Sequence, residues 1–377
     1  KTVLDPFCGS GTVLLEGILA GFNVIGADSN PLARLITKVK VTPLPKKEME
    51  MALKKIFEVA VSETDRKVPH HVLDLNYWYP RKSINELSAI RNAISANTHG
   101  DVKDFFLVCF SSLAKRVSYA DPAVSVPVKL NPKKFIEDSD KYKGAISAIS
   151  KIEKVDILEA YKSLAAQNIR RMDLLYEVYD RGELVKIYED ARDINGGAVD
   201  KKHGGYADII ITSPPYAGAQ KYIRSSSLSL GWLGFCDSVA LRDYERKNIG
   251  REHFAVAEYR SLKKVGDKYA DDFISDIYSV NPLRAHILYA YLVEMRESIA
   301  AMYDALRPGG KLVMVVAPNT ICGKSFRTNE AIKEMVKDAG FSLELEMIDS
   351  IKSRGLMTKR NKTAGLISSE WIYVFSR

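Results

Sequence analysis

Seven short apolar runs along this chain read as β-strands, because each is rich in Val, Ile, Leu or aromatic residues and is shorter than an ordinary helix. They occupy residues 2–5, 23–28, 184–188, 207–211, 311–316, 342–348 and 370–375. Apolar positions at helical spacing lie between several of them, at residues 13–20, from Pro31 onward, at 286–306 and at 329–339. Strands that alternate with helices form right-handed βαβ units around a buried parallel core. The pattern predicts an α/β fold whose last two strands are antiparallel to each other, with a tight turn at residues 307–310.

A long helical stretch separates the second strand from the third. Residues 49–61 and 152–179 carry apolar positions at helical spacing with charged faces between them. We therefore predict a sheet domain made of residues 1–45 and 183–377, into which residues 46–182 are inserted as a largely helical subdomain.

The most informative segment of the chain, Thr212-Ser213-Pro214-Pro215-Tyr216, directly follows the strand at residues 207–211. Its two prolines remove two backbone donors and stiffen the turn. Open α/β sheets bind their ligands at this edge, outside the carboxyl ends of the strands. A serine hydroxyl, a proline carbonyl and a tyrosine ring at this edge can hold a flat heterocycle by its amino group while the ring stacks on its face.

A glycine-rich loop follows the first strand, which ends at Asp5 and continues as Pro6-Phe7-Cys8-Gly9-Ser10-Gly11-Thr12. Glycines let the backbone approach a ligand closely. The next strand ends in Asp28, and an acid at that position binds ribose hydroxyls in dinucleotide folds. The loop is not a phosphate loop, because no Gly-Lys-Ser/Thr follows. It also differs from Gly-x-Gly-x-x-Gly, because Asp-Pro-Phe precedes its Gly-x-Gly pair.

The glycine loop and the Thr-Ser-Pro-Pro-Tyr segment together resemble the amino-group DNA methyltransferases that use S-adenosylmethionine. The resemblance covers the sheet domain, roughly half of the chain, and the two motifs in one sheet are far more specific than either alone. Ser213 is typical of the cytosine-N4 branch, whereas the adenine-N6 branch more often has Asp or Asn there. The resemblance implies a Rossmann-like, seven-stranded class I methyltransferase sheet.

The same resemblance implies roles for individual residues. Asp5 would orient the loop and the amino end of the methionine moiety of the cofactor, and Asp28 would bind its ribose. Asp190 would accept a hydrogen bond from the adenine amino group, with Asp193 as the nearby alternative. The implied cofactor-binding residues are Asp5, Pro6, Phe7, Gly9, Ser10, Gly11, Thr12, Asp28, Asn30, Asp190, Ala191 and Thr212, and the implied catalytic residues are Ser213, Pro214, Pro215 and Tyr216.

The exocyclic amine of a nucleobase is a weak nucleophile, because its lone pair is delocalised into the ring. The Ser213 side chain and the Pro214 carbonyl can accept its hydrogens, and Tyr216 can stack on the base and hold it toward the methyl donor. Alignment of nitrogen, methyl carbon and sulfur would supply most of the rate. The base must be flipped out of the duplex, because its amine is buried there. The sulfonium drives the reaction, so no metal is expected.

Three alternatives stay open: adenine-N6 methylation of DNA, guanine-N2 methylation of transfer RNA, and a cofactor-binding scaffold without chemistry. Transfer RNA enzymes share an Asp-Pro-Phe-Cys-Gly-x-Gly loop and a Pro-Pro-Tyr turn, but usually have Asp before the prolines and an RNA-binding domain ahead of the fold. Intact Ser213 and Tyr216 argue against the scaffold. Carbon-5 methylation of cytosine is disfavoured, because none of the four cysteines follows a proline.

Composition and charge bear on the partners. A net charge of +8 fits a polyanion such as double-stranded DNA without proving it. Four scattered cysteines favour neither a zinc site nor a disulfide scaffold, and the pair His70-His71 reads as a solvated loop. No apolar stretch has the length of a membrane span and no signal-peptide pattern is visible. We expect a cytoplasmic protein without a membrane partner; the abrupt start on a strand is compatible with a lost leading segment.

Recognition of a DNA sequence must come from other parts of the chain. Residues 222–285, which are rich in Lys, Arg and aromatic residues, form the candidate target-recognition region, and the helical insertion is the alternative. A basic loop that holds Lys352, Arg354, Lys359, Arg360 and Lys362 could contact backbone phosphate. A cognate restriction endonuclease is a candidate partner.

Overall fold

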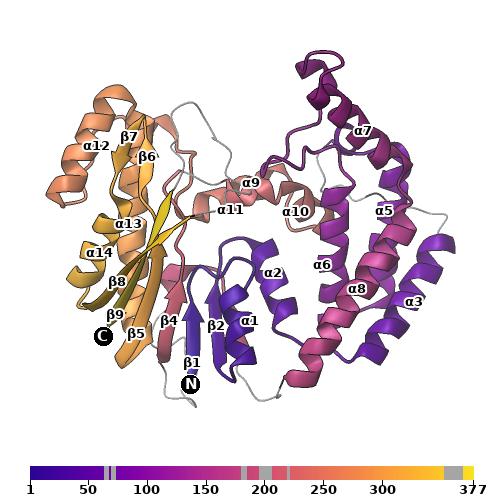
Figure 1. The fold of residues 1–377 in the computed structure, drawn as a ribbon, viewed down its shortest axis with the longest axis horizontal. Coiled ribbons are helices and arrows are strands. Elements are labelled where there is room, and N and C mark those ends of the chain that lie inside the picture. Colours follow the sequence, from indigo (N-terminus) through magenta and orange to yellow (C-terminus); the bar gives the residue numbers. More distant parts are fainter. Residues whose placement is uncertain (63–67, 69–73, 180–184, 195–205, 219–220, 352–367) are drawn as a thin grey trace. The chain divides into compact units, whose positions relative to one another are not determined.

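The computed structural model describes residues 1–62, 68, 74–179, 185–194, 206–218, 221–351 and 368–377. The chain divides into two compact units, a sheet unit and a helical unit (Figure 1). The sheet unit comprises Lys1–Thr37, Arg181–Lys221 and Tyr244–Arg377. The helical unit comprises Lys38–Asp180 and Tyr222–Asp243. Two sequence predictions, the His70-His71 loop and the basic loop that begins at Lys352, lie outside the described residues.

The sheet unit is built on a seven-stranded sheet in the order β3-β2-β1-β4-β5-β9-β8. The first five strands in this order pair in parallel, whereas β9 is antiparallel to both β5 and β8. This confirms the predicted seven strands, the antiparallel pair at the end and the Rossmann-like class I methyltransferase sheet. The strands are β1 (Thr2–Asp5), β2 (Asn23–Ala27), β3 (Val185–Tyr188), β4 (Ala207–Thr212), β5 (Leu306–Val316), β8 (Ser342–Ser350) and β9 (Ser369–Ser376).

Helices and short elements complete the sheet unit. A core of fully buried Leu4, Ile25, Ile210 and Leu312 from four parallel strands packs with Met295 of the longest helix. The elements are α1 (Thr12–Leu19), α2 (Pro31–Lys40), η2 (Ala191–Asp193), α11 (Ser238–Lys247), η4 (Val256–Tyr259), α12 (Lys268–Val280), α13 (Pro282–Ala305), the hairpin of β6 (Asn319–Ile321) and β7 (Lys324–Phe326), and α14 (Thr328–Asp338). The unit boundaries fall within α2 and α11.

Two local predictions were wrong. Residues 307–310 were predicted as a turn, but they belong to β5, where the peptide groups of Gly309 and Gly310 pair with the backbone of Arg377 at 2.8 and 3.1 Å. The helix predicted over residues 152–179 is two helices, α7 (Asp140–Lys154) and α8 (Ile157–Val178). Asp156 caps the second of them by accepting a hydrogen bond from the backbone N–H of Glu159 at 3.0 Å. The β6–β7 hairpin was not predicted.

The helical unit has its own apolar core. Trp232 is completely buried, with its ring edge-on to Tyr79 and Phe110 at centroid distances of 5.7 and 5.6 Å. Its carbonyl accepts a hydrogen bond of 2.6 Å from Arg91. The elements are α3 (Lys46–Ser62), α4 (Leu75–Trp78), α5 (Arg81–Asn97), α6 (Gly100–Arg116), η1 (Pro132–Lys134), α7, α8, α9 (Tyr222–Ser225) and α10 (Ser227–Leu233). In the described part of the chain, no helix is both long and apolar enough to span a membrane.

Candidate active site

The two sequence motifs meet at one edge of the sheet. Because β1 and β4 are neighbouring parallel strands, with Val3 opposite Ile209 and Leu4 opposite Ile210, their carboxyl ends emerge side by side. The Thr212 hydroxyl donates a hydrogen bond of 2.7 Å to Oδ1 of Asp5, and the Phe7 backbone N–H donates one of 3.0 Å to the same oxygen. The structure therefore joins the start of the glycine loop directly to the start of the Ser-Pro-Pro-Tyr segment.

The glycine loop has the backbone conformation that its glycines permit. Gly9 and Gly11 have φ angles of 51° and 77°, in the left-handed region that other residues rarely adopt. A Cβ at Gly11 would lie 2.7 Å from the side chain of Thr37, whereas a Cβ at Gly9 would meet nothing within 4 Å. The Thr37 hydroxyl donates to the Gly9 carbonyl at 3.0 Å. The loop is thus held from behind by α2, and the backbone at Gly9 is open to close approach.

Asp28 supports this loop from the end of the neighbouring strand. Its two carboxylate oxygens accept hydrogen bonds from the backbone N–H groups of Gly9, at 3.0 Å, and Asn30, at 2.7 Å. Burial raises the pKa of Asp28, although the hydrogen bonds from Asn30 and Gly9 oppose that rise. The Asn30 side chain in turn accepts from the Leu32 backbone N–H at 3.0 Å, so it stabilises the start of α2. These bonds tie the glycine loop and the turn before α2 to Asp28, and they also hold the Asp28 carboxylate in one orientation.

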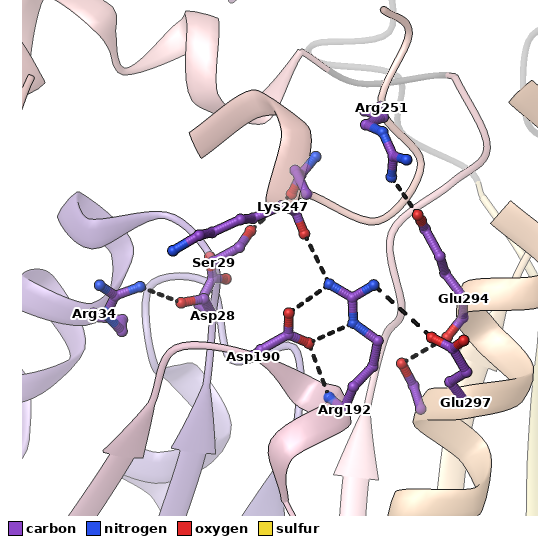
Figure 2. Close-up of polar contacts among 11 residues, drawn as sticks. Asp28, Ser29, Arg34, Asp190, Arg192, Lys247, Arg251, Glu294 and Glu297 are labelled. Carbon is purple, nitrogen blue, oxygen red and sulfur yellow. Dashed lines mark hydrogen bonds and ion pairs between the residues drawn. The ribbon is translucent and has the colours of Figure 1, made fainter. Parts of the chain in front are cut away.

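Asp190 follows β3 and is held by a neighbouring arginine. The Nε and Nη2 atoms of Arg192 donate to its two carboxylate oxygens at 2.9 and 2.5 Å, and the Arg192 backbone N–H donates at 2.9 Å (Figure 2). Burial opposes ionisation of Asp190, but the hydrogen bonds and charge of Arg192 outweigh it and lower the pKa of this carboxyl. Asp190 is therefore a fixed, ionised acceptor, next to buried Ala191, whereas Asp193 is exposed.

A segment that the motifs did not predict crosses this edge: residues 244–251, called the strap below. Its Asn248 side chain accepts a hydrogen bond of 2.9 Å from Ser29. The Lys247 carbonyl accepts one of 3.3 Å from Arg192 (Figure 2). Arg251 forms an ion pair with Glu294 of α13. Lys247 and Arg251 lie in the basic region 222–285, but their partners are far away in the chain, so the sequence alone does not predict these contacts.

The Ser-Pro-Pro-Tyr segment lies at the same edge, beside the strap. Ser213 is exposed, Pro214 is buried, and Pro215 and Tyr216 are half-buried. The Tyr216 hydroxyl donates to Glu370 at 3.1 Å. Just after the tyrosine, the Ala217 carbonyl accepts a hydrogen bond from Asn319 at 2.7 Å, and the Gly218 N–H donates to the Gly250 carbonyl at 3.1 Å. The segment thus presents an exposed hydroxyl while its backbone is held on two sides.

Gly250 of the strap packs directly on the Tyr216 backbone, and we expect Gly250→Ala to destabilise the fold. The new Cβ would lie 2.8 Å from the Tyr216 carbonyl oxygen, and the φ of 78° is already unfavourable for alanine. The free energy of unfolding, measured in urea, should fall by about 2–3 kcal/mol. Gly266→Ala is the matched control, because its φ of 93° carries the same strain but a Cβ there meets nothing within 4 Å. Equal losses in the two variants would contradict the packing argument.

The buried Asp5 carboxyl gives the fold a pH dependence. Burial raises the pKa of Asp5 from 3.8 to about 7, while the hydrogen bonds from Thr212 and Phe7 lower it and the charge of Asp28 adds to the rise. The folded state therefore holds this proton more tightly than the unfolded chain does. The resulting stabilisation is complete below about pH 3.8 and is lost as the pH rises through about 7.

Asparagine is a neutral isostere of the protonated acid. We therefore expect Asp5→Asn to remove the part of the decrease in unfolding free energy between about pH 4 and 7 that Asp5 causes. Urea midpoints at several pH values for both proteins would measure the difference. Parallel curves over that range would show that Asp5 is not the group responsible.

Within the residues that the structure describes, no three His, Cys, Asp or Glu side chains are clustered in a way that could bind a metal ion. The Asp28 and Asp190 side chains and the half-buried backbone of Gly9 at this edge instead suit the hydroxyl and amino groups of a nucleoside. An adenosine-containing cofactor therefore fits the donor set present.

Comparison with known proteins supports a methyltransferase. The chain is 25% identical to the Type II methyltransferase M.MvaI of Kocuria varians, over 89% of this chain and 74% of that protein. It is 22% identical to the Type II methyltransferase M.BsoBI of Geobacillus stearothermophilus, over 74% of this chain but only 55% of that protein. A SAM-dependent methyltransferase from Methanosarcina mazei aligns over the whole chain with 9% identity and a TM-score of 0.32, which is too low to add to the argument. No family model matches the chain.

The methyltransferase relatives bear out the predicted class of enzyme and S-adenosylmethionine as its cofactor. They do not separate the cytosine-N4 branch from the adenine-N6 branch. Over most of its length the chain is therefore similar to Type II methyltransferases, and its sheet and joined motifs agree with that similarity.

Proposed function

We propose that this protein is a site-specific DNA methyltransferase that transfers a methyl group from S-adenosylmethionine to the N4 amine of a cytosine flipped out of duplex DNA. One observation carries the proposal: the 2.7 Å hydrogen bond from Thr212 to Asp5, which places the Ser-Pro-Pro-Tyr segment beside the glycine loop. A methyl group can pass directly between two ligands only if their sites adjoin. Two loops that emerge from neighbouring parallel strands meet this requirement.

The cofactor site in this proposal lies along the ends of β1, β2 and β3. The open backbone at Gly9 admits the methionine portion, the Asp28 carboxylate binds the ribose, and the ionised Asp190 accepts from the adenine amino group. When bound, S-adenosylmethionine supplies an electrophilic methyl group on a positively charged sulfur. Asp190 can bind Arg192 and the adenine together, because an ionised carboxylate has about four acceptor positions.

The base site lies at the end of β4. The exposed Ser213 hydroxyl and the Pro214 carbonyl accept hydrogens of the exocyclic amine, which brings its lone pair out of conjugation with the ring. The Tyr216 ring stacks on the flipped base, and base–aromatic stacking contributes about 1–3 kcal/mol. The backbone contacts of Ala217 and Gly218 keep this surface in place while the duplex is bound. Serine ahead of the prolines favours cytosine-N4 over adenine-N6 by resemblance to that branch.

Contacts to the DNA sequence are proposed for residues 222–285 and for the helical insertion. Residues 222–243 of this region belong to the helical unit and the remainder to the sheet unit. The net charge of +8 supports a polyanionic partner. A cognate restriction endonuclease is a proposed partner, on the strength of the Type II names of the relatives.

The experiment that tests the function uses labelled S-adenosylmethionine with unmethylated duplex DNA, with transfer RNA and with no acceptor. The modified nucleoside is then identified by mass spectrometry. We expect N4-methylcytosine from the duplex and no label in the other two reactions. N6-methyladenine would keep the enzyme class and change the base. Label confined to transfer RNA, or cofactor binding without transfer to any acceptor, would refute the proposal.

A further inference from the structure

The antiparallel strand β9 brings a carboxylate to the ligand edge that no motif assigns. Strands β1 to β5 reach this edge with their carboxyl ends. Because β9 runs in the opposite direction, its amino end lies there instead, with Trp371 paired to Val316 at the end of β5. Glu370 comes one residue before Trp371 and is half-buried. A residue near the end of the chain therefore lies next to the loop that follows β4.

Glu370 contacts the proposed catalytic tyrosine. Its Oε1 atom accepts a hydrogen bond of 3.1 Å from the Tyr216 hydroxyl. The backbone of Tyr216 is also held. Gly250 packs on the Tyr216 carbonyl, and Asn319 donates a hydrogen bond to the carbonyl of the next residue, Ala217. A tyrosine side chain that is anchored at its backbone and at its hydroxyl cannot swing about χ1. The two anchors thus fix the position of the ring and the direction of its long axis.

We propose that Glu370 is a positioning residue for methyl transfer, which holds the Tyr216 ring in the orientation that stacks on the flipped base. The inference rests on the proposed function, because it takes Tyr216 as the stacking residue. The contact lies at the hydroxyl, on the rim of the ring, so the Glu370 carboxylate does not itself cover a face of the ring. A carboxylate oxygen accepts the phenolic hydrogen and carries no donor of its own that could turn the hydroxyl away, which suits this role.

A double-mutant cycle tests the proposal. Glu370→Ala and Tyr216→Phe should each lower kcat by about tenfold, because each removes one partner of the hydrogen bond that holds the ring. The double variant should lose no more than either single variant, since the interaction can be lost only once. Glu370→Gln keeps an acceptor oxygen and should retain most of the turnover. The Kd for S-adenosylmethionine should stay unchanged throughout.

Asp349→Ala is the matched control, because Asp349 is an exposed carboxylate directly opposite Glu370 on β8. It should leave kcat unchanged, and circular dichroism should show all variants folded. An unchanged kcat in Glu370→Ala, or losses that multiply in the double variant, would overturn the inference while leaving the proposed function intact.

A second readout needs neither DNA nor cofactor. With 3-fluorotyrosine placed at position 216, the fluorine NMR signal should move and broaden in Glu370→Ala but not in Asp349→Ala. A signal that does not respond to loss of Glu370 would also overturn the inference. If the wild-type protein methylated no nucleic acid, the proposed function would fail, and the fluorine signal would still decide whether Glu370 holds the ring.

Discussion

Tyr216→Ala should lower kcat for methyl transfer by at least about a hundredfold, because it removes the surface that stacks on the base and so loses the alignment of the amine with the methyl group. The Kd for S-adenosylmethionine should stay within about threefold, because the cofactor residues Asp28 and Asp190 belong to other strand ends. Steady-state kinetics with saturating duplex DNA, together with isothermal titration of the cofactor, would separate the two effects.

Tyr216→Phe is the graded control for this prediction. It keeps the aromatic ring and loses only the hydroxyl contact with Glu370, so its loss should be about tenfold and clearly smaller than that of alanine. A Tyr216→Ala protein that binds the cofactor poorly yet turns over bound cofactor normally would show that the tyrosine belongs to the cofactor site.

Asp28→Ala should raise the Kd for S-adenosylmethionine by about a hundredfold, since two hydrogen bonds to the ribose hydroxyls are lost in the proposed complex. The carboxylate has two functions at once. It holds the backbone N–H groups of Gly9 and Asn30 at 3.0 and 2.7 Å, and in the proposed complex it binds the ribose hydroxyls. Isothermal titration with S-adenosylmethionine or S-adenosylhomocysteine would measure the change without any nucleic acid.

Two further variants make this result interpretable. Asp28→Asn keeps one acceptor oxygen and should lose about tenfold in affinity. Glu189→Ala removes a nearby carboxylate that is 69% exposed and pairs with Arg34 at 3.0 Å, so it should leave the Kd within about threefold. An Asp28→Ala protein that is folded and binds the cofactor normally would mean that Asp28 only supports the loop.

The strands and the two motifs could be predicted from the sequence because their signals are local. A buried parallel strand such as residues 207–212 is a short run of apolar residues, and it needs no knowledge of its neighbours. Glycine at position 11 is similarly informative, because its φ of 77° follows from the demands of a single turn. Residues 307–310 were wrongly predicted as a turn, because the backbone that pairs with them as a strand is that of Arg377, far away in the sequence.

The supporting residues of the site could not be predicted in the same way. Arg192 lies two residues from Asp190, but its geometry depends on the Lys247 carbonyl in the strap. Gly250 looks like an ordinary loop glycine until the Tyr216 backbone is seen against it. Glu370 looks like an ordinary strand-end acid, and its contact with Tyr216 depends on the direction in which β9 runs.

The amino-acid sequence by itself determined the alternation of strands and helices, the glycine loop and the Ser-Pro-Pro-Tyr turn, because these depend on torsion angles and on burial within a few consecutive residues. The tertiary structure alone decided that Thr212 bonds Asp5, that the strap crosses three strand ends and that Glu370 reaches Tyr216. Those contacts join residues from about 30 to more than 200 positions apart, so they follow from strand order and direction, which no local pattern contains.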